Sequence, residues 1–169
     1  MEAIGTIYKN VRFRSRLEAR WAVFFDNYGL KWEYEPETFK LKNGILYCPD
    51  FYLPDLKCYA EVKQKRDLCN EYISTDYDLN TGVILSQVER TKLFLFEKNI
   101  CLLIGTPRDE PFVFFNLLHK NISIYPIFNR YNFWHWHHCE YLNDFGDHRG
   151  VTDIETAAKI AREYDFFKF

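Results

Sequence analysis

The clearest pattern of apolar positions lies near the start of the chain, between residues 15 and 28. Its apolar residues recur three or four positions apart, as on one face of an amphipathic helix. They are Leu17, Trp21, Phe24 and Tyr28. Ser15 is placed to cap this helix, Glu18 to complete a capping box, and Gly29 to end it. Glu18 lies on the flank of the buried stripe, where periodicity alone favours capping over catalysis.

Alternating apolar and polar positions further along predict a β-hairpin in the segment YCPDFYLPDLKCYAEVK. A tight turn at residues 54–55 is expected to set residue 50 opposite residue 59. Because side chains alternate between the two faces of a strand, Asp50 is expected to share a face with Glu61 and Lys63. The opposite face carries residues suited to a core: Cys58, Ala60 and Val62.

The predicted hairpin brings two carboxylates together with an ammonium group. In this register Asp50 and Glu61 are diagonal neighbours, roughly 7 Å apart at their Cα atoms, which is within reach of one shared metal ion. Carboxylate oxygens are the ligands that Mg²⁺ prefers in proteins. An isolated Glu-x-Lys motif is most often an ordinary solvated strand, so the hypothesis depends on the segments that surround it.

The remaining pattern predicts further strands and helices in one α/β fold, with a central mixed β-sheet flanked by helices. A strand, a helix, a buried strand, one or two aromatic-rich strands and a final helix are expected. They cover Lys31–Lys42, Leu85–Asn99, Ile100–Ile104, Val113–Cys139 and Asp153–Tyr164. The final helix has a stripe of small residues, typical of close packing on the domain or on a second copy. The glutamates of the first strand are expected to face solvent: Glu33, Glu35 and Glu37.

Length and composition fit a single domain. The chain has 169 residues, 47% of them hydrophobic, which is enough for a good core. A nuclease-like core over about 11–106 is expected, with aromatic-rich strands and the last helix over 107–169. No apolar run is long enough to span a bilayer and no leader is visible, so we expect a soluble, cytoplasmic protein without membrane contact. Five unpatterned cysteines indicate reduced thiols.

The segment Trp134–Cys139 suggests zinc at first sight. On a strand His135, His137 and Cys139 share one face, but their fixed separation does not easily close a tetrahedron without partners from elsewhere. Stacking of nucleic-acid bases on the tryptophans is a second possibility. Plain core packing is favoured for this segment.

Four segments together resemble the PD-(D/E)XK nuclease superfamily: SRLEARWAVFFD, WEYEPETF, YCPDFYLPDL and AEVK. The resemblance is to the branch with an additional glutamate on the first helix, to which small phage-type endonucleases belong. It is dense from Val11 to Lys63 and weaker afterwards. Phage members usually have glycine after the lysine, where this chain has Gln64.

The resemblance implies a metal-dependent DNA endonuclease that hydrolyses phosphodiester bonds. It implies metal ligands at Asp50 and Glu61, a helix carboxylate at Glu18 and a catalytic lysine at Lys63. Mg²⁺ or Mn²⁺ is the expected cofactor, with the Val62 carbonyl as a further ligand. Lys63 is expected to orient the attacking water or to offset developing negative charge.

The charge of the chain is the main observation against a nucleic-acid enzyme. The net charge is -2, whereas generic nucleic-acid binders tend to be basic. The basic residues nevertheless cluster around the first helix and after the catalytic strand, where they would contact phosphates. The predicted contacts are Arg12, Arg14, Arg16, Arg20, Lys65 and Arg66. An ordinary solvated, charged face is the alternative.

Two other classes of function stay open. One is a catalytically silent protein that has the nuclease fold and binds nucleic acid or a partner protein. The other is a nuclease subunit of a larger nucleoprotein complex, inactive alone. A homodimer is possible, since junction-cutting relatives usually dimerise.

Overall fold

The protein is described by a computed structural model, which covers residues 5–64, 91–93, 95–107, 113–116, 121–123 and 154–167. Outside these residues lie Lys65, Arg66 and the segment Trp134–Cys139, for which core packing is favoured over zinc binding, together with most of the aromatic-rich region. Of the helix predicted over Leu85–Asn99, residues 91–93 and 95 are helical. In the described ranges, no helix has both the length and the apolar character needed to cross a membrane.

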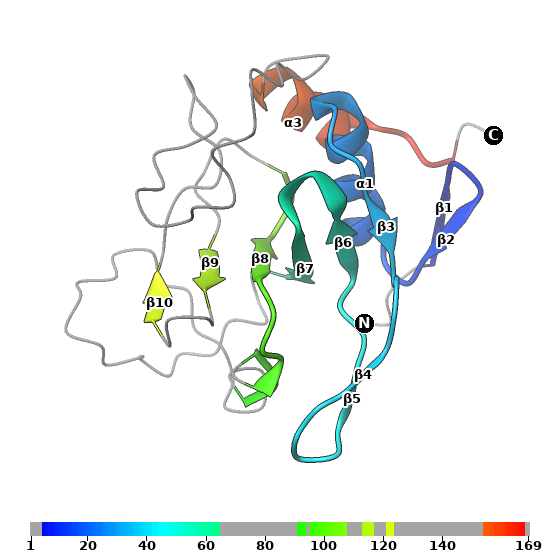
Figure 1. The fold of residues 1–169 in the computed structure, drawn as a ribbon. Coiled ribbons are helices and arrows are strands. Elements are labelled where there is room, and N and C mark those ends of the chain that lie inside the picture. Colours follow the sequence, from blue (N-terminus) through cyan, green and yellow to red (C-terminus); the bar gives the residue numbers. More distant parts are fainter. Residues whose placement is uncertain are drawn as a thin grey trace.

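A mixed β-sheet forms the centre of the described structure (Figure 1). Its six strands lie in the order β10-β9-β8-β7-β6-β3, with β7 and β8 parallel and the other neighbours antiparallel. The strands are β3 (Glu33–Tyr34), β6 (Phe51–Leu53), β7 (Cys58–Lys63), β8 (Ile100–Ile104), β9 (Val113–Asn116) and β10 (Asn121–Ser123). The expected mixed sheet with helices is thus confirmed.

Two short antiparallel pairs lie outside this sheet. β1 (Thr6–Tyr8) pairs with β2 (Val11–Phe13), and β4 (Phe39–Lys40) pairs with β5 (Leu46–Tyr47). The single strand predicted over Lys31–Lys42 is therefore wrong, because its two ends belong to different sheets. Glu35 has a positive φ of 45° between them, and this conformation ends β3.

Helix α1 (Arg16–Tyr28) follows the sequence prediction closely. The Ser15 hydroxyl accepts a hydrogen bond from the backbone N–H of Glu18 at 3.2 Å, as an N-cap does. Gly29 ends the helix with a φ of 86°, in the left-handed region that glycine adopts without strain. Local sequence alone therefore fixes both ends of α1.

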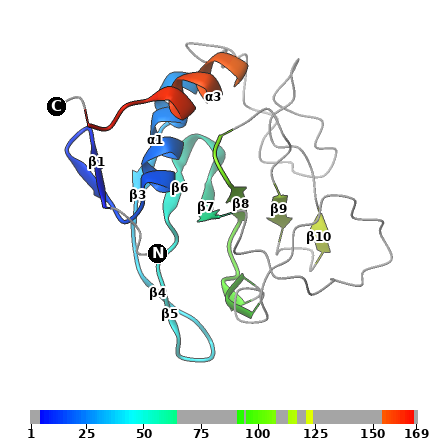
Figure 2. The same ribbon diagram turned by 180° about the vertical axis from the view of Figure 1, so that it is seen from behind.

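Helix α3 (Ile154–Glu163) packs against α1 (Figure 2). Three of its alanines are fully buried. Ala157, Ala158 and Ala161 allow the two helices a close approach, which confirms the predicted packing on the domain. The Arg20 guanidinium donates to the carbonyl of Ala161 at 2.6 Å and to that of Arg162. A cation at the carboxyl end of a helix satisfies carbonyls that lack helical partners.

The two faces of the sheet contact different groups of side chains. One face, called here the helix face, packs against α1 and α3 and carries Phe51, Ala60, Cys101 and Leu103. The opposite face, called here the site face, carries Tyr59, Ile100 and Leu102, which cluster with Leu41, Tyr47, Leu93 and Phe96. The predicted core positions of β7 thus lie on the helix face, and Glu61 and Lys63 lie on the site face by alternation.

The turn between β6 and β7 is longer than the sequence suggested. Residues Pro54–Leu56 form a 3₁₀ turn, and Lys57 follows with a φ of 47°. Phe51 therefore pairs with Ala60 and Leu53 with Cys58, which shifts the predicted register by two residues. Because the shift is even, every side chain keeps its predicted face.

Candidate active site

Asp50 lies just before β6, and its carboxylate is almost fully buried, with 6% of the residue exposed. When the register of β6 and β7 is continued by one residue, Asp50 comes opposite Glu61 instead of diagonal to it. One carboxylate oxygen accepts a hydrogen bond from the Val62 backbone N–H at 2.7 Å. The regular ladder between β6 and β7 ends at Phe51 and Ala60, so the side chain continues the pairing where backbone pairing stops.

Glu61 and Lys63 lie on β7 beside Asp50. The Lys63 ammonium is 3.0 Å from one carboxylate oxygen of Glu61, and both side chains are mostly buried. The other oxygen of Glu61 accepts a hydrogen bond from the Tyr47 hydroxyl at 2.8 Å. The predicted juxtaposition of Glu61 with Lys63 is therefore present.

Glu18 points from the first turn of α1 and combines a structural role with proximity to the other acids. One carboxylate oxygen accepts from the Ser15 hydroxyl at 2.6 Å. The other accepts from the backbone N–H of Arg14 at 3.1 Å and from the Tyr34 hydroxyl at 2.5 Å. The capping box is thus present in altered form, since the carboxylate reaches the N–H of Arg14 instead of that of Ser15.

Arg14 contacts three acidic side chains of the site: Asp50, Glu35 and Glu18. Its guanidinium is 2.8 Å from a carboxylate oxygen of Asp50 and 2.7 Å from one of Glu35. Its backbone N–H is the one that binds Glu18. The side chain is 58% exposed, although its partner Asp50 is buried, so the guanidinium lies between the site and solvent.

The acidic side chains of the site outnumber the two cationic groups that contact them, Arg14 and Lys63. Burial raises the pKa of Asp50 to about 8; the charges of Glu61 and Glu18 add to the rise, and the Val62 N–H and Arg14 oppose it. Burial, followed by the charge of Glu61, also raises the pKa of the Tyr47 hydroxyl. Such a cluster favours either a proton or an added cation.

The chemistry of the donors fits a hard divalent ion, because carboxylate oxygens suit Mg²⁺ and Mn²⁺. In the described part of the chain, however, no group of three or more His, Cys, Asp or Glu side chains converges closely enough to hold a metal. The three acids are instead bound by Arg14, Tyr34, Tyr47, Lys63 and backbone N–H groups. A bound ion would have to replace some of these donors.

The residues predicted to contact phosphates have different surroundings. Arg12 is exposed on β2, and the Arg16 guanidinium lies over the ring of Phe167 at 4.7 Å. Arg20 holds the end of α3, as described above, so its guanidinium has a structural role. Among the described members of this set, Arg14 touches the acids of the site.

Sequence reasoning missed three residues of the site: Tyr34, Tyr47 and Glu35. The two tyrosines donate to acids that lie 16 and 14 positions away in the chain. Their positions in strand-forming segments gave a signal for secondary structure and none for these partners. The glutamate was expected to face solvent, and it is exposed, but it also binds Arg14.

Comparison of the chain with models of protein families, with curated proteins and with solved structures gives no match. The resemblance described from the sequence thus stays a prediction.

Proposed function

We propose that the protein is a metal-dependent DNA endonuclease with a restriction-endonuclease-like core. The observation that carries the proposal is the position of Asp50. Its buried carboxylate is bound to the backbone of β7 between Glu61 and Lys63, the two residues that the resemblance identifies as ligand and catalytic lysine. Glu18 joins the same network through Arg14.

The proposed roles follow from the chemistry of each group. Asp50, Glu61, the Val62 carbonyl and Glu18 would hold Mg²⁺ or Mn²⁺. When bound, such an ion stabilises negative charge on the oxygens of a phosphodiester. Lys63 positions the attacking water or offsets charge that develops on the phosphate. Its contact with Glu61 at 3.0 Å keeps the ammonium at the site while the substrate is absent.

DNA binding in this proposal depends on local charge. The net charge of -2 gives no general attraction to a polyanion, so contacts must come from basic groups close to the cut. Arg12 and Arg14 are exposed beside α1 and are suited to phosphate contact. Lys65 and Arg66, directly after β7 in sequence, complete the proposed set.

A cleavage assay tests the proposal directly. Purified protein is incubated with supercoiled plasmid and with branched DNA, in Mg²⁺ or Mn²⁺ and in chelator. We expect metal-dependent cutting that Asp50→Ala, Glu61→Ala and Lys63→Ala each reduce by roughly 100-fold or more. Glu33→Ala is the matched control, because it removes an exposed acid outside the site. Equal cutting by wild-type and Asp50→Ala protein would refute the site.

The second candidate is a catalytically silent nuclease-fold protein that binds nucleic acid or a partner. The observation that favours it is that the acids are held by protein donors and do not converge as a metal cluster among the described residues. Calorimetry with Mn²⁺ separates the candidates, since a silent protein binds DNA without taking up the ion. Cutting that appears only with added partner proteins would instead indicate a subunit of a nucleoprotein complex. Sedimentation would show whether a homodimer forms.

A further inference from the structure

Asp50 divides its two carboxylate oxygens between donors of different kinds. Oδ2 accepts from the Val62 backbone N–H at 2.7 Å, and this donor is fixed because it belongs to β7. Oδ1 accepts from the Arg14 guanidinium at 2.8 Å. That side chain is 58% exposed, so it can exchange Asp50 for another partner. A ligand can therefore take Oδ1 by displacing a side chain, whereas taking Oδ2 would break a contact of the sheet.

Glu61 shows the same division. Its oxygen Oε1 lies 3.0 Å from the ammonium of Lys63, a cation on a long and flexible side chain. Its oxygen Oε2 accepts from the Tyr47 hydroxyl at 2.8 Å. Each of the two acids thus has one oxygen on a cationic side chain. At Glu61, the Tyr47 hydroxyl has the position that a backbone N–H has at Asp50.

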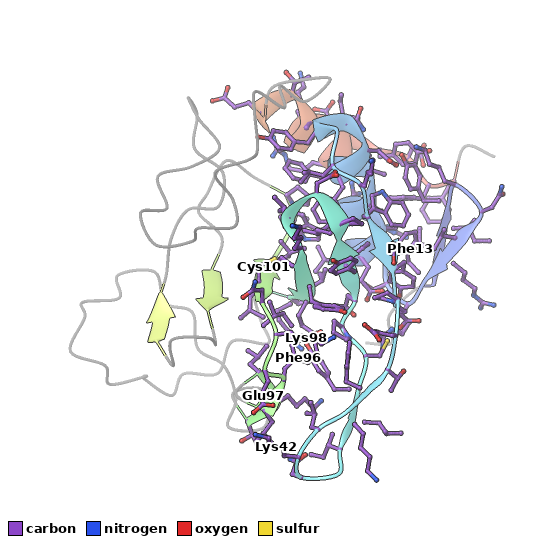
Figure 3. All side chains as sticks on the ribbon, in the orientation of Figure 1. Phe13, Lys42, Phe96, Glu97, Lys98 and Cys101 are labelled. Atoms are coloured by element: carbon purple, nitrogen blue, oxygen red, sulfur yellow. The ribbon has the colours of Figure 1, made fainter. Side chains whose placement is uncertain are left out.

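The Tyr47 hydroxyl is a fixed donor because the ring that carries it is packed. Tyr47 is 5% exposed and ends β5. Its ring meets that of Phe96 edge-on, with centroids 5.1 Å apart, and both residues belong to the core cluster of the site face. Figure 3 shows Phe96 beside the β4–β5 hairpin, where this packing occurs. Close packing restricts a buried ring, so the hydroxyl has little freedom to follow Glu61.

Without this hydroxyl, the orientation of Glu61 would depend on Lys63. An ammonium group has three donors on a flexible stem, so it can bind either oxygen of a carboxylate. The Tyr47 hydroxyl opposes such a rotation by binding Oε2, and Oε1 stays the oxygen that can change partners. Outer partners of this kind orient the ligands of metal ions and support the affinity for the ion.

We propose that Tyr47 is a positioning residue, whose hydroxyl holds Glu61 with Oε1 available to a divalent ion. This inference rests on the ion binding of the proposed function, and it adds to the site a residue from outside the six-stranded sheet. Tyr47 then contributes to the affinity for the ion and not to the chemical step. Loss of the hydroxyl should weaken ion binding, while cutting persists when the ion is saturating.

Tyr47→Phe tests the hydroxyl, because the substitution retains the ring and removes one oxygen. The full chain is titrated with Mn²⁺ in an isothermal calorimeter, without DNA. The variant should bind Mn²⁺ about 10–100-fold more weakly than wild type, as is typical when an outer partner of a metal ligand is lost. Urea denaturation in chelator confirms that the variant is folded. Equal affinities in variant and wild type overturn the inference.

Tyr59→Phe is the matched control. Tyr59 is 8% exposed, its ring also meets Phe96 edge-on at 5.1 Å, and its hydroxyl also donates to a glutamate. That glutamate is Glu37, which is not among the proposed ligands. The control should leave the affinity for Mn²⁺ unchanged. If both variants lose the same affinity, the effect comes from packing around Phe96, and the inference is overturned.

The dependence of plasmid cutting on Mn²⁺ separates positioning from structural damage. Tyr47→Phe should need about 10–100-fold more Mn²⁺ for half-maximal cutting and should recover most of the wild-type rate at saturation. A merely structural role would lower the rate at every concentration of the ion. A lower saturating rate with an unchanged requirement for Mn²⁺ therefore overturns the inference.

The part of Lys63 is tested by a double-mutant cycle. In Lys63→Ala protein the ammonium that could rotate Glu61 is absent. Adding Tyr47→Phe there should cost clearly less Mn²⁺ affinity than it costs in wild type. An equal loss in both backgrounds would show that the hydroxyl does not act against Lys63, which also overturns the inference.

Calorimetry decides this inference and cutting decides the nuclease function, so the two can fail separately. If Tyr47→Phe binds Mn²⁺ as wild type does, this inference fails, and the nuclease proposal stands where Asp50-dependent cutting persists. If Mn²⁺ binding depends on Tyr47 but wild type cuts no DNA, the nuclease proposal fails and Tyr47 keeps its role in ion binding. Wild-type protein that takes up no Mn²⁺ overturns both.

Discussion

The two faces of β7 differ sharply although they alternate along the same few residues. On the helix face, Ala60 is fully buried among aromatic and aliphatic side chains. On the site face, its neighbour Glu61 lies among charged and hydroxyl groups, and Asp50 is buried with an elevated pKa. The helix face is therefore packed with apolar side chains. On the site face acidic groups lie close together, and a bound cation would reduce the free-energy cost of their repulsion. Substitutions on the two faces should have different consequences.

The largest loss of stability from a single substitution is expected on the helix face. Phe51→Ala removes a fully buried ring that packs against Phe13, Phe25, Trp32 and Tyr34. The free energy of unfolding should fall by about 3–5 kcal/mol, as for other buried phenylalanines. Urea denaturation measures the loss. Tyr52→Ala, at the half-buried neighbour on the other face, is the control, and an equal loss there would remove the distinction between the faces.

On the site face, stability without metal should depend on pH through Asp50. Its folded-state pKa of about 8 lies above the unfolded value, so the folded state retains the proton over a range in which the unfolded state loses it. The free energy of unfolding should therefore fall as pH rises from about 4 to about 8, by up to about 1.4 kcal/mol per pH unit. Thermal melts across this range measure the slope.

Asp50→Asn is the control for that slope, because it resembles the protonated acid at every pH. The variant should lose most of the decline and be more stable than wild type at pH 9 in chelator. Added Mg²⁺ should stabilise wild type but not the variant. A wild-type slope that the substitution leaves intact would assign the pH dependence to other groups.

A smaller effect is expected for Arg14→Ala. Its guanidinium lies 2.8 Å from the Asp50 carboxylate, so a divalent ion that binds Asp50 must compete with it. Removing that competitor should tighten Mn²⁺ binding roughly tenfold, which corresponds to about 1.4 kcal/mol. Isothermal calorimetry without DNA measures the affinity. Arg12→Ala, an exposed arginine two residues away, should leave it unchanged, and weaker Mn²⁺ binding by Arg14→Ala would contradict the competition.

The smallest effect concerns the cap that joins α1 to the site. Ser15→Ala removes the acceptor for the Glu18 N–H and the donor to its carboxylate. Stability should decrease by about 1 kcal/mol, as for other N-caps. Ser15→Thr keeps a capping hydroxyl and should recover most of the loss in urea denaturation. Equal losses in both variants would show that the hydroxyl does not stabilise the helix.

Much of the fold and of the candidate site could be predicted where the controlling interactions are local. The ends of α1 follow from Ser15 and Gly29, which act on backbone groups of the same helix. The shared face of Glu61 and Lys63 follows from strand alternation, which survives an even error in register. These predictions needed no knowledge of distant contacts.

What could not be predicted depends on unusual backbone angles and distant partners. Lys57 and Glu35 have positive φ values, which are uncommon for such side chains, and they lengthen one turn and split one predicted strand. The Arg14–Asp50 pair joins residues 36 positions apart. No periodic pattern in the sequence encodes such a pairing.

The hydrogen bonds from Arg20 to the end of α3 have a consequence for biosynthesis. One of them joins residues 141 positions apart, and the alanines of α3 pack in the same core cluster as α1. During translation the first helix therefore emerges from the ribosome long before its cover is made. The face of α1 that α3 covers is therefore exposed in the nascent chain until α3 has been made, and chaperone dependence in cells is the expected result.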